Sequence, residues 1–316
     1  MARIDLHCHL DGSLSQSCVE TLLGRVVNMQ ELQVNYDCTS LAEYLEKFDL
    51  PLKGLQTQSG LYQAGVDFIK SSAEQKLDYV EVRFAPLLSC QEGLDCKKVV
   101  ESVLSGLEEG RKLYGVDYGV ITCAMRHHSE EDNLAMFRCA REFLGEGVCG
   151  ADLAGNEAAF PMKLFFNLFE QVKKMNLPFT IHAGECGDAR NIRDAVWCGA
   201  KRIGHGIAMS GHEDIIRFCN EQRIGIEMCP ISNLQTKAVF DVKKYPMKEF
   251  LSRNLLVTIN TDNRTVSQTS LEKEIEFVKL YADITEDDII KMSKNAIEVA
   301  FASDDVKHRL WKLSGL

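Results

Sequence analysis

The 316-residue chain lacks the marks of exported, membrane-embedded and nucleic-acid-binding proteins. No apolar stretch approaches the length of a membrane-spanning helix, and the N-terminal MARIDLHCHLDGS does not resemble a signal peptide. Lys and Arg number 36 against 46 Asp and Glu, a formal net charge of -10. Because phosphates need cationic side chains for neutralisation, this balance argues against nucleic acid or an anionic membrane as partner.

Paired cysteine motifs are also missing. The 12 cysteines are scattered, and none form a CxxC pair. In a long chain without an export signal, this pattern favours free thiols and a reducing, cytoplasmic location.

Eight short β-like runs recur along the chain, with helical stretches between them. They cover residues 2–9, 78–86, 117–125, 147–155, 178–185, 201–206, 223–230 and 255–263. Several are apolar at consecutive positions, as expected of parallel strands buried on both faces. Because strand and helix alternate eight times and no GxGxxG loop follows the first strand, the pattern predicts an α/β fold of the (β/α)8 TIM-barrel type rather than an open doubly wound sheet.

No linker or low-complexity segment divides the chain, so residues 1–316 are expected to form one barrel domain. The first connection, from about Leu14 to Asp78, is too long for one crossover helix and is expected to hold a helical insertion. A further helix is predicted over residues 97–110, with Gly110 as its end. Its apolar stripe comprises Val99, Val100, Val103, Leu104 and Leu107.

The first connection carries a second apolar stripe. It consists of Leu41, Tyr44, Leu45 and Phe48, spaced i, i+3, i+4 and i+7. Taken alone, such a stripe is most often ordinary core packing. The alternative is an apolar lid over the barrel mouth.

Polar side chains with chemical potential fall at the ends of the predicted strands. These are His7 and His9, His182 and Glu185, His205, and Asp262 and Asn263. In a (β/α)8 barrel the carboxyl ends of the strands form the active-site face, so these positions are expected to converge.

Alternation along the first strand places His7 and His9 on one face, where two imidazoles could bind one metal ion. An HxH pair alone is weak evidence, but a third histidine and an aspartate at other strand ends strengthen it. Three imidazoles and one carboxylate suit zinc with a position left for water, although iron and cobalt accept the same donors. The competing interpretation is that His182 and His205 are satisfied core histidines.

A single metal ion is expected. Binuclear barrel hydrolases usually place a bridging lysine at the end of the fourth strand, where this chain reads ADLAGNE and has no lysine before Lys163. The H-x-E plus PCxxC signature of the other zinc deaminases is absent.

The strand-end motifs closely resemble the adenosine deaminase family, and its bacterial branch in particular. The matching pieces are HCHLDGS at 7–13, DLAGNE at 152–157, HAGE at 182–185, GHG at 204–206, CPISNLQT at 229–236 and NTDN at 260–263. The resemblance implies a zinc-dependent hydrolase that converts adenosine or 2′-deoxyadenosine to inosine or deoxyinosine and ammonia. A zinc-activated water would be the nucleophile.

By this resemblance, one zinc ion per chain is bound by His7, His9, His182 and Asp262. Glu185 matches the acid that protonates purine N1, a role that burial would support by raising its pKa. His205 matches the residue that orients and helps deprotonate the zinc-bound water, and Asp262 also contacts that water.

The resemblance also implies the contacts to the purine nucleoside. His9 and Asp11 lie on its side of the metal, with Asp11 holding a ribose hydroxyl, and the Gly155 N–H faces purine N3. The stripe of Leu41, Tyr44, Leu45 and Phe48 matches the family's hydrophobic lid. One departure is Asn263, where better-known members have an aspartate that bonds N7. An amide N–H₂ can donate to N7 directly, so we expect the contact to persist.

Three alternatives remain open at this point. Sibling families deaminate adenine or N6-modified AMP on the same scaffold, but adenine deaminases resemble this motif with Glu in place of Asp11, and no basic cluster for a phosphate stands out. A purine-binding protein without catalysis would lack a ligand, Glu185 or His205. A barrel hydrolase for amides or esters would account for the metal but not for the purine-type motifs.

Overall fold

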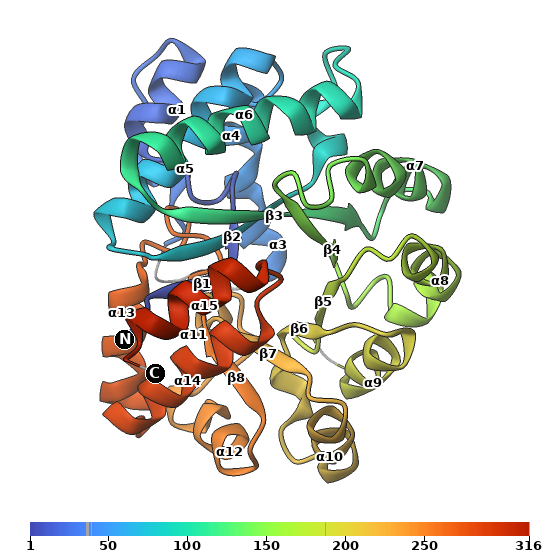
Figure 1. Ribbon diagram of the computed structural model, residues 1–316, viewed down its shortest axis with the longest axis vertical. Helices are drawn as coiled ribbons and strands as arrows, with labels where there is room; N and C mark the ends of the chain where they lie inside the picture. Colours follow the sequence, from blue (N-terminus) through green and yellow to red (C-terminus); the bar gives the residue numbers. More distant parts are fainter. Residues whose placement is uncertain (36–37, 39, 187, 316) are drawn as a thin grey trace.

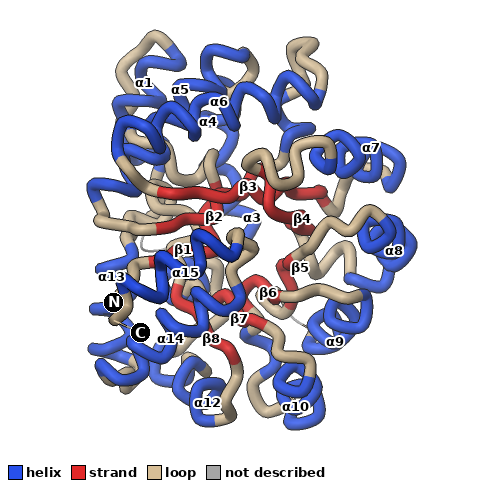
Figure 2. Tube along the Cα trace, in the orientation of Figure 1, coloured by secondary structure: helices blue, strands red, loops and turns tan. Residues whose placement is uncertain are grey.

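The computed structural model describes residues 1–35, 38, 40–186 and 188–315, and the side chains of residues 41 and 42 also lie outside the description. Eight strands stand at the centre, surrounded by helices (Figures 1 and 2). The strands are β1 (Ile4–His9), β2 (Tyr79–Phe84), β3 (Asp117–Met125), β4 (Val148–Ala154), β5 (Thr180–Ala183), β6 (Arg202–His205), β7 (Gly225–Met228) and β8 (Leu256–Ile259).

The strands form two parallel four-stranded runs, β1-β2-β3-β4 and β5-β6-β7-β8. Parallel bridges between Ala151 and Phe179 and between Cys8 and Asp262 join the runs at both seams. At the second seam, the His9 N–H donates to the Asp262 carbonyl at 2.7 Å, and the Asp262 N–H donates to the His7 carbonyl at 2.8 Å. The prediction of a closed (β/α)8 barrel is confirmed, and its closing seam carries three candidate ligands.

The helical insertion after the first strand is also present. Between β1 and β2 the chain forms α1 (Gln16–Leu23), α2 (Met29–Leu32), α3 (Leu41–Leu45), η1 (Glu46–Phe48), α4 (Asp49–Gly54) and α5 (Gln58–Glu74). Local capping fixes several of their starts. Ser15, Ser40 and Thr57 each accept a backbone N–H at the N-terminus of a helix, which satisfies donors that the first turn leaves free.

The remaining helices follow the other strands around the barrel. They are η2 (Pro86–Ser89), α6 (Cys96–Tyr114), α7 (Glu130–Arg141), η3 (Met162–Phe165), α8 (Phe166–Lys174), α9 (Ala189–Cys198), η4 (Ile207–Met209), α10 (Glu213–Glu221), α11 (Pro230–Gln235), η5 (Val242–Lys244), α12 (Met247–Ser252), α13 (Leu271–Tyr281), α14 (Glu286–Val299) and α15 (Asp304–Leu313).

The expected end of the helix at Gly110 is wrong. Helix α6 continues to Tyr114, and Gly115, in the left-handed region, is its C-cap. A Cβ at Gly110 would lie 2.7 Å from the Ile69 Cβ on α5. Gly110 therefore allows α5 and α6 to pack closely. In the sequence alone, a glycine that permits close helix packing looks the same as one that ends a helix.

The C-terminal helices close the end of the barrel at which the strands begin. Ala296, Ile297 and Leu310 on α14 and α15 pack against Ile4 and other buried side chains of β1 and β2. In Figure 1, α15 crosses in front of the strands. The opposite end, where the strands finish, is left for the site. No helix in the described part of the chain is long and apolar enough to cross a membrane.

Candidate active site

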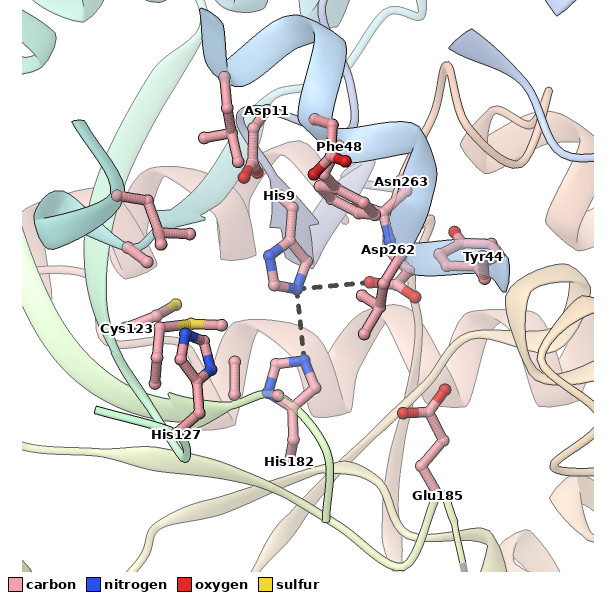
Figure 3. Close-up of a pocket in the computed structure, with 18 of the residues that line it drawn as sticks. His9, Asp11, Tyr44, Phe48, Cys123, His127, His182, Glu185, Asp262 and Asn263 are labelled. Atoms are coloured by element: carbon pink, nitrogen blue, oxygen red, sulfur yellow. Dashed lines mark hydrogen bonds and ion pairs between the residues drawn. The ribbon is translucent and has the colours of Figure 1, made fainter. Parts of the chain in front are cut away.

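A pocket of about 360 Å³ opens at the carboxyl ends of the strands. Side chains from the strand ends form its floor, and the helical insertion contributes to its wall (Figure 3). Its lining comprises His9, Asp11, Tyr44, Leu45, Phe48, Asp49, Leu52, Ala85, Leu88, Gln91, Cys123, Met125, His127, Ala154, Gly155, His182, Glu185, His205, Asp262 and Asn263. Most sequence-predicted site residues therefore share one cavity.

Four side chains converge as a group that could hold a metal ion. His7, His9, His182 and Asp262 each offer one donor atom, and these atoms lie within 4.8 Å of one another. The His9 Nε2 atom is 3.3 Å from His182 Nε2 and 3.5 Å from Asp262 Oδ1, as the dashed lines in Figure 3 indicate. Donors bound to one ion at about 2.0–2.2 Å lie at such separations from one another, so the group fits a single small cation.

The buried His7 imidazole gives a second indication of a metal. Its Nε2 atom is 3.4 Å from Asp262 Oδ1 and has no hydrogen-bond partner among the described residues. A buried polar atom without a partner is costly, whereas a metal ion would satisfy it. The four residues therefore fit the ion that their types suggest.

Carboxylates support the histidines from behind. Glu227 Oε2 is 2.8 Å from His7 Nδ1, and Asp152 Oδ2 is 2.9 Å from His182 Nδ1. Such contacts leave the Nε2 atoms free as ligands and fix the orientation of each ring. The hydroxyl of Ser232 donates to Asp262 Oδ2 at 2.6 Å, which leaves Oδ1 for the ion.

One buried guanidinium joins the two supporting carboxylates. Arg83 donates to Asp152 at 2.9 Å and to Glu227 at 2.8 Å, and all three side chains have no exposed surface. Burial would raise the pKa of Asp152, but the charges of His182 and Arg83 hold the pKa well below its usual value. Arg202 adds a second cation, which donates to Glu227 at 2.6 Å.

Sequence reasoning missed this network. Its signal was present, since Glu81, Arg83, Arg202 and Glu227 are charged residues within otherwise buried strands. Such residues are almost never fully buried unless they are paired.

Glu185 and His205 lie close to each other beside the candidate metal group, and the His205 ring centroid is 4.9 Å from that of His7 and 5.2 Å from that of His182. Glu185 Oε2 is 3.7 Å from His205 Nε2, and Thr236 donates to Glu185 Oε1 at 3.2 Å. Burial, with further contributions from the negative charges of Asp262 and Glu157, raises the pKa of Glu185 to about 8. At neutral pH this carboxyl group is therefore mostly protonated and can donate a proton.

The short helix α11 contacts three of these groups. Its Ser232 donates to Asp262, the Asn233 Nδ2 atom lies 2.9 Å from His205 Nδ1, and Thr236, just after the helix, donates to Glu185. These three contacts show what the CPISNLQT motif does in the fold: one rigid turn orients three side chains from three different strand ends.

The backbone adopts the left-handed region at two of the same positions. His205 has a φ of 65° and Asp262 a φ of 59°. Histidine and aspartate are among the residues other than glycine that tolerate this region best, so both side chains reach the pocket from an uncommon backbone conformation.

The substrate-side residues surround the same cavity. Asp11 is 7% exposed, burial raises its pKa to about 6, and its Oδ1 atom has no partner in the described part of the chain. Asn263 also lines the pocket. Its Oδ1 atom packs so closely against Gly12 that a Cβ on this glycine would lie only 1.9 Å from it. Gly155, with a φ of 103°, borders the pocket through its backbone.

The apolar stripe is divided between core and cavity. Tyr44 is buried, lines the pocket, and shares a 2.6 Å hydrogen bond with Ser267. Leu45 and Phe48 also line the pocket, and the Phe48 ring centroid is 6.5 Å from that of His9. The side chain of Leu41, the fourth residue of the stripe, lies outside the described residues.

Comparisons with known proteins find relatives over nearly the whole chain. The model of the adenosine deaminase family matches residues 2–313. An adenosine deaminase from Enterococcus faecalis is 39% identical over 319 residues, which cover 98% of this chain and 95% of the relative.

Two solved structures share the fold. An adenine deaminase from Arthrobacter aurescens superposes with a TM-score of 0.89 at 22% identity, covering 99% of this chain and 98% of that one. An Arabidopsis N6-mAMP deaminase gives a TM-score of 0.88 at 23% identity, covering 100% and 98%. With the family model and the close relative both spanning nearly the whole chain, the protein belongs to the adenosine deaminase family.

Proposed function

We propose that the chain catalyses the hydrolytic deamination of adenosine and 2′-deoxyadenosine to inosine and deoxyinosine with release of ammonia. The observation that carries the proposal is the convergence of one acid, Glu185, with a three-histidine, one-aspartate group in a single cavity. The adenosine deaminase from Enterococcus faecalis, similar over nearly the full length, supports the same substrate.

Zinc is the ion that we propose for the group of His7, His9, His182 and Asp262, with one ion per chain. Three neutral imidazoles and one carboxylate are a donor set that zinc accepts in catalytic sites, with a position left for water. When bound there, zinc would activate a water molecule as a nucleophile at neutral pH.

The remaining catalytic work falls to groups of the chain itself. Attack at C6 of the purine places electrons on N1, and the protonated carboxyl of Glu185 donates a proton to that atom. His205, held by Asn233, orients the attacking water and helps to take up its proton. That proton then passes to the amino group, so that the C6–N bond breaks and ammonia leaves, while the proton of the new C6 hydroxyl returns to Glu185 as the carbonyl of inosine forms. Asp262, whose Oδ2 is held by Ser232, contacts the same water.

Backbone and amide groups orient the substrate. The Gly155 N–H donates to purine N3, and the Asn263 amide donates to N7. Asp11 accepts a hydrogen bond from a ribose hydroxyl beside His9. Tyr44, Leu45 and Phe48 form an apolar cover over the base, with Leu41 as the fourth member of the stripe.

Adenine and N6-modified AMP are less favoured substrates. Asp11 offers an acceptor for a sugar hydroxyl, which adenine does not have. Among the described residues that line the pocket there is no Lys or Arg to neutralise a phosphate, while Asp11 and Asp49 are both acidic. Turnover of adenosine, adenine and N6-methyl-AMP, measured side by side by ammonia release, tests the choice. Faster turnover of adenine or N6-methyl-AMP than of adenosine would overturn it.

Replacing Asp11 by alanine is expected to lower kcat/KM for adenosine by about 10- to 100-fold, because a hydrogen bond to a charged acceptor is lost. The 2′-, 3′- and 5′-deoxy analogues serve as matched substrates. The analogue that lacks the bound hydroxyl should react equally well with D11A and with the unmodified protein. Equal losses for all three analogues would show that Asp11 does not hold the sugar.

Replacing Asn263 by alanine is expected to lower kcat/KM for adenosine by about tenfold, because purine N7 loses its donor. The N263D variant restores the carboxyl group of better-known members and is expected to gain little, since the amide already donates. A many-fold rise in kcat/KM for N263D in steady-state kinetics would contradict this account of the asparagine.

A further inference from the structure

Glu157 ends the DLAGNE motif after β4 and is buried, with 3% of its surface exposed. Its carboxylate accepts hydrogen bonds from three consecutive backbone N–H groups, those of Gly184 at 2.6 Å, Glu185 at 3.0 Å and Cys186 at 3.2 Å. The Asn191 side chain donates a fourth bond at 2.8 Å. These donors belong to the loop after β5 and to helix α9, so Glu157 holds the segment that presents Glu185 to the pocket.

The Glu157 carboxylate is satisfied by amides rather than by a cation. Among the described residues, no Lys, Arg or His nitrogen lies within ion-pair distance of the Glu157 carboxylate. The nearby Arg126 donates to the carbonyls of Phe160 and His182 instead. Four donors and no acceptor face Glu157, and an ionised carboxylate is the form that accepts all four bonds. The Glu157 carboxylate therefore lies behind Glu185 with amides as its hydrogen-bond partners, and Arg126 is the nearby cation that interacts with it electrostatically.

Burial and two negative charges favour the neutral form of Glu185, whereas the Thr236 hydroxyl and His7 favour its ionised form. Asp262 at the end of β8 and Glu157 after β4 are the negative charges that raise its pKa beyond the effect of burial, and His7 opposes them weakly. His205 on β6 and Thr236 after α11 contact the Glu185 carboxyl directly, and the Cys186 thiol is its neighbour along the chain. Of these groups, Glu157 alone also bonds the Glu185 backbone.

We propose that Glu157 is a positioning residue with two effects on Glu185: its hydrogen bonds fix the loop that carries the acid, and its negative charge, held directly behind that loop, favours the neutral form of the acid. The inference rests on the proposed function, in which Glu185 must donate a proton. It also gives the last residue of DLAGNE a role that neither the metal group nor the substrate contacts require.

Two variants of Glu157 distinguish its effect on the position of the loop from its effect on the charge of Glu185. Glutamine is nearly isosteric and removes the charge, while its N–H₂ group meets backbone donors that need an acceptor. Aspartate keeps the charge but is shorter by one methylene group, so it reaches the loop less well. N191A is the matched control, because it removes one bond to Glu157 and leaves the carboxylate in place.

The test is the pH dependence of kcat/KM for adenosine in the four proteins. The rate should fall at high pH as Glu185 loses its proton, and E157Q should move this fall to lower pH by about one unit. E157D should lower kcat at least several-fold yet keep the fall near that of the unmodified protein. N191A should shift it by less than about 0.3 unit.

Each of these results either supports or overturns the inference. A high-pH fall in E157Q that coincides with that of N191A overturns the electrostatic effect, and an E157D variant with undiminished kcat overturns the positioning effect. If E157Q does not fold, E157D still tests the inference, because a lower kcat with an unmoved high-pH fall supports it and any other pattern contradicts it. Failure of the unmodified, metal-loaded protein to deaminate adenosine would instead contradict the proposed function.

Discussion

Replacing Glu185 by glutamine is expected to lower kcat for adenosine by about 10²- to 10⁴-fold, the usual contribution of general acid catalysis. The amide is close in size to the carboxyl and can still accept the bond from Thr236, but it has no acidic proton for purine N1. KM should change little, since the loss falls on the step in which the proton moves.

The same residue sets the direction of the pH dependence. The pKa of Glu185 is raised to about 8. In the proposed mechanism the protonated form is the active one. The rate of adenosine deamination should therefore be maintained below pH 8 and should fall as the pH rises through that value. In E185Q the small residual rate should lose this fall.

Two measurements accompany the kinetics of E185Q. Metal content, measured by elemental analysis, should match that of the unmodified protein, because Glu185 is not among the four candidate ligands. The matched control is E221Q on the exposed part of α10, which should retain full activity. A kcat of E185Q within tenfold of the unmodified value would show that another group supplies the proton.

Replacing Arg83 by methionine is expected to lower the free energy of unfolding by about 3–5 kcal/mol. The variant leaves Asp152 and Glu227 buried with a cation removed from both. Because these carboxylates orient His182 and His7, metal affinity should also fall by about 10- to 100-fold. Denaturant unfolding of the metal-free protein and competition with a chelator measure the two effects separately.

Two control variants show how much of the R83M effect is specific to the buried network. K97M removes a cation from an exposed pair with Glu142 and should change the free energy of unfolding far less than R83M does, because solvent screens exposed ion pairs. R202K retains a charge beside Glu227 without a contact to Asp152, so its effect on metal affinity should be smaller than that of R83M. Unchanged metal affinity in R83M would mean that the histidines are oriented without this network.

The sequence predicted the barrel because eight apolar runs alternate with helices, an inference that needs only periodicity and topology. The convergence of strand ends indicated a metal site near His7 and His9, but the choice of His182 and Asp262 as the other two candidate ligands rested on the resemblance to the adenosine deaminase family. The packing of individual residues was harder to predict from the sequence. Gly110 in its sequence context is typical of a helix end, and the sequence does not reveal that the neighbouring helix α5 approaches so closely.

The supporting groups of the site were harder to predict than its ligands. Arg83, Asp152 and Glu227 lie on three different strands, and their pairing depends on the register across the barrel. The buried charges within strands were a visible signal, but which partners they choose was not. Glu157 likewise looks like an ordinary polar residue in a loop until its four donors are seen together.

Metal-dependent turnover of adenosine tests the account most directly. The protein is stripped with a chelator, its metal content is checked, and the ultraviolet change from adenosine to inosine is followed before and after zinc is returned. We expect no turnover in the stripped protein and full recovery at one equivalent of zinc per chain. Turnover that survives removal of the metal, or a zinc-loaded protein that leaves adenosine unchanged, would contradict the account.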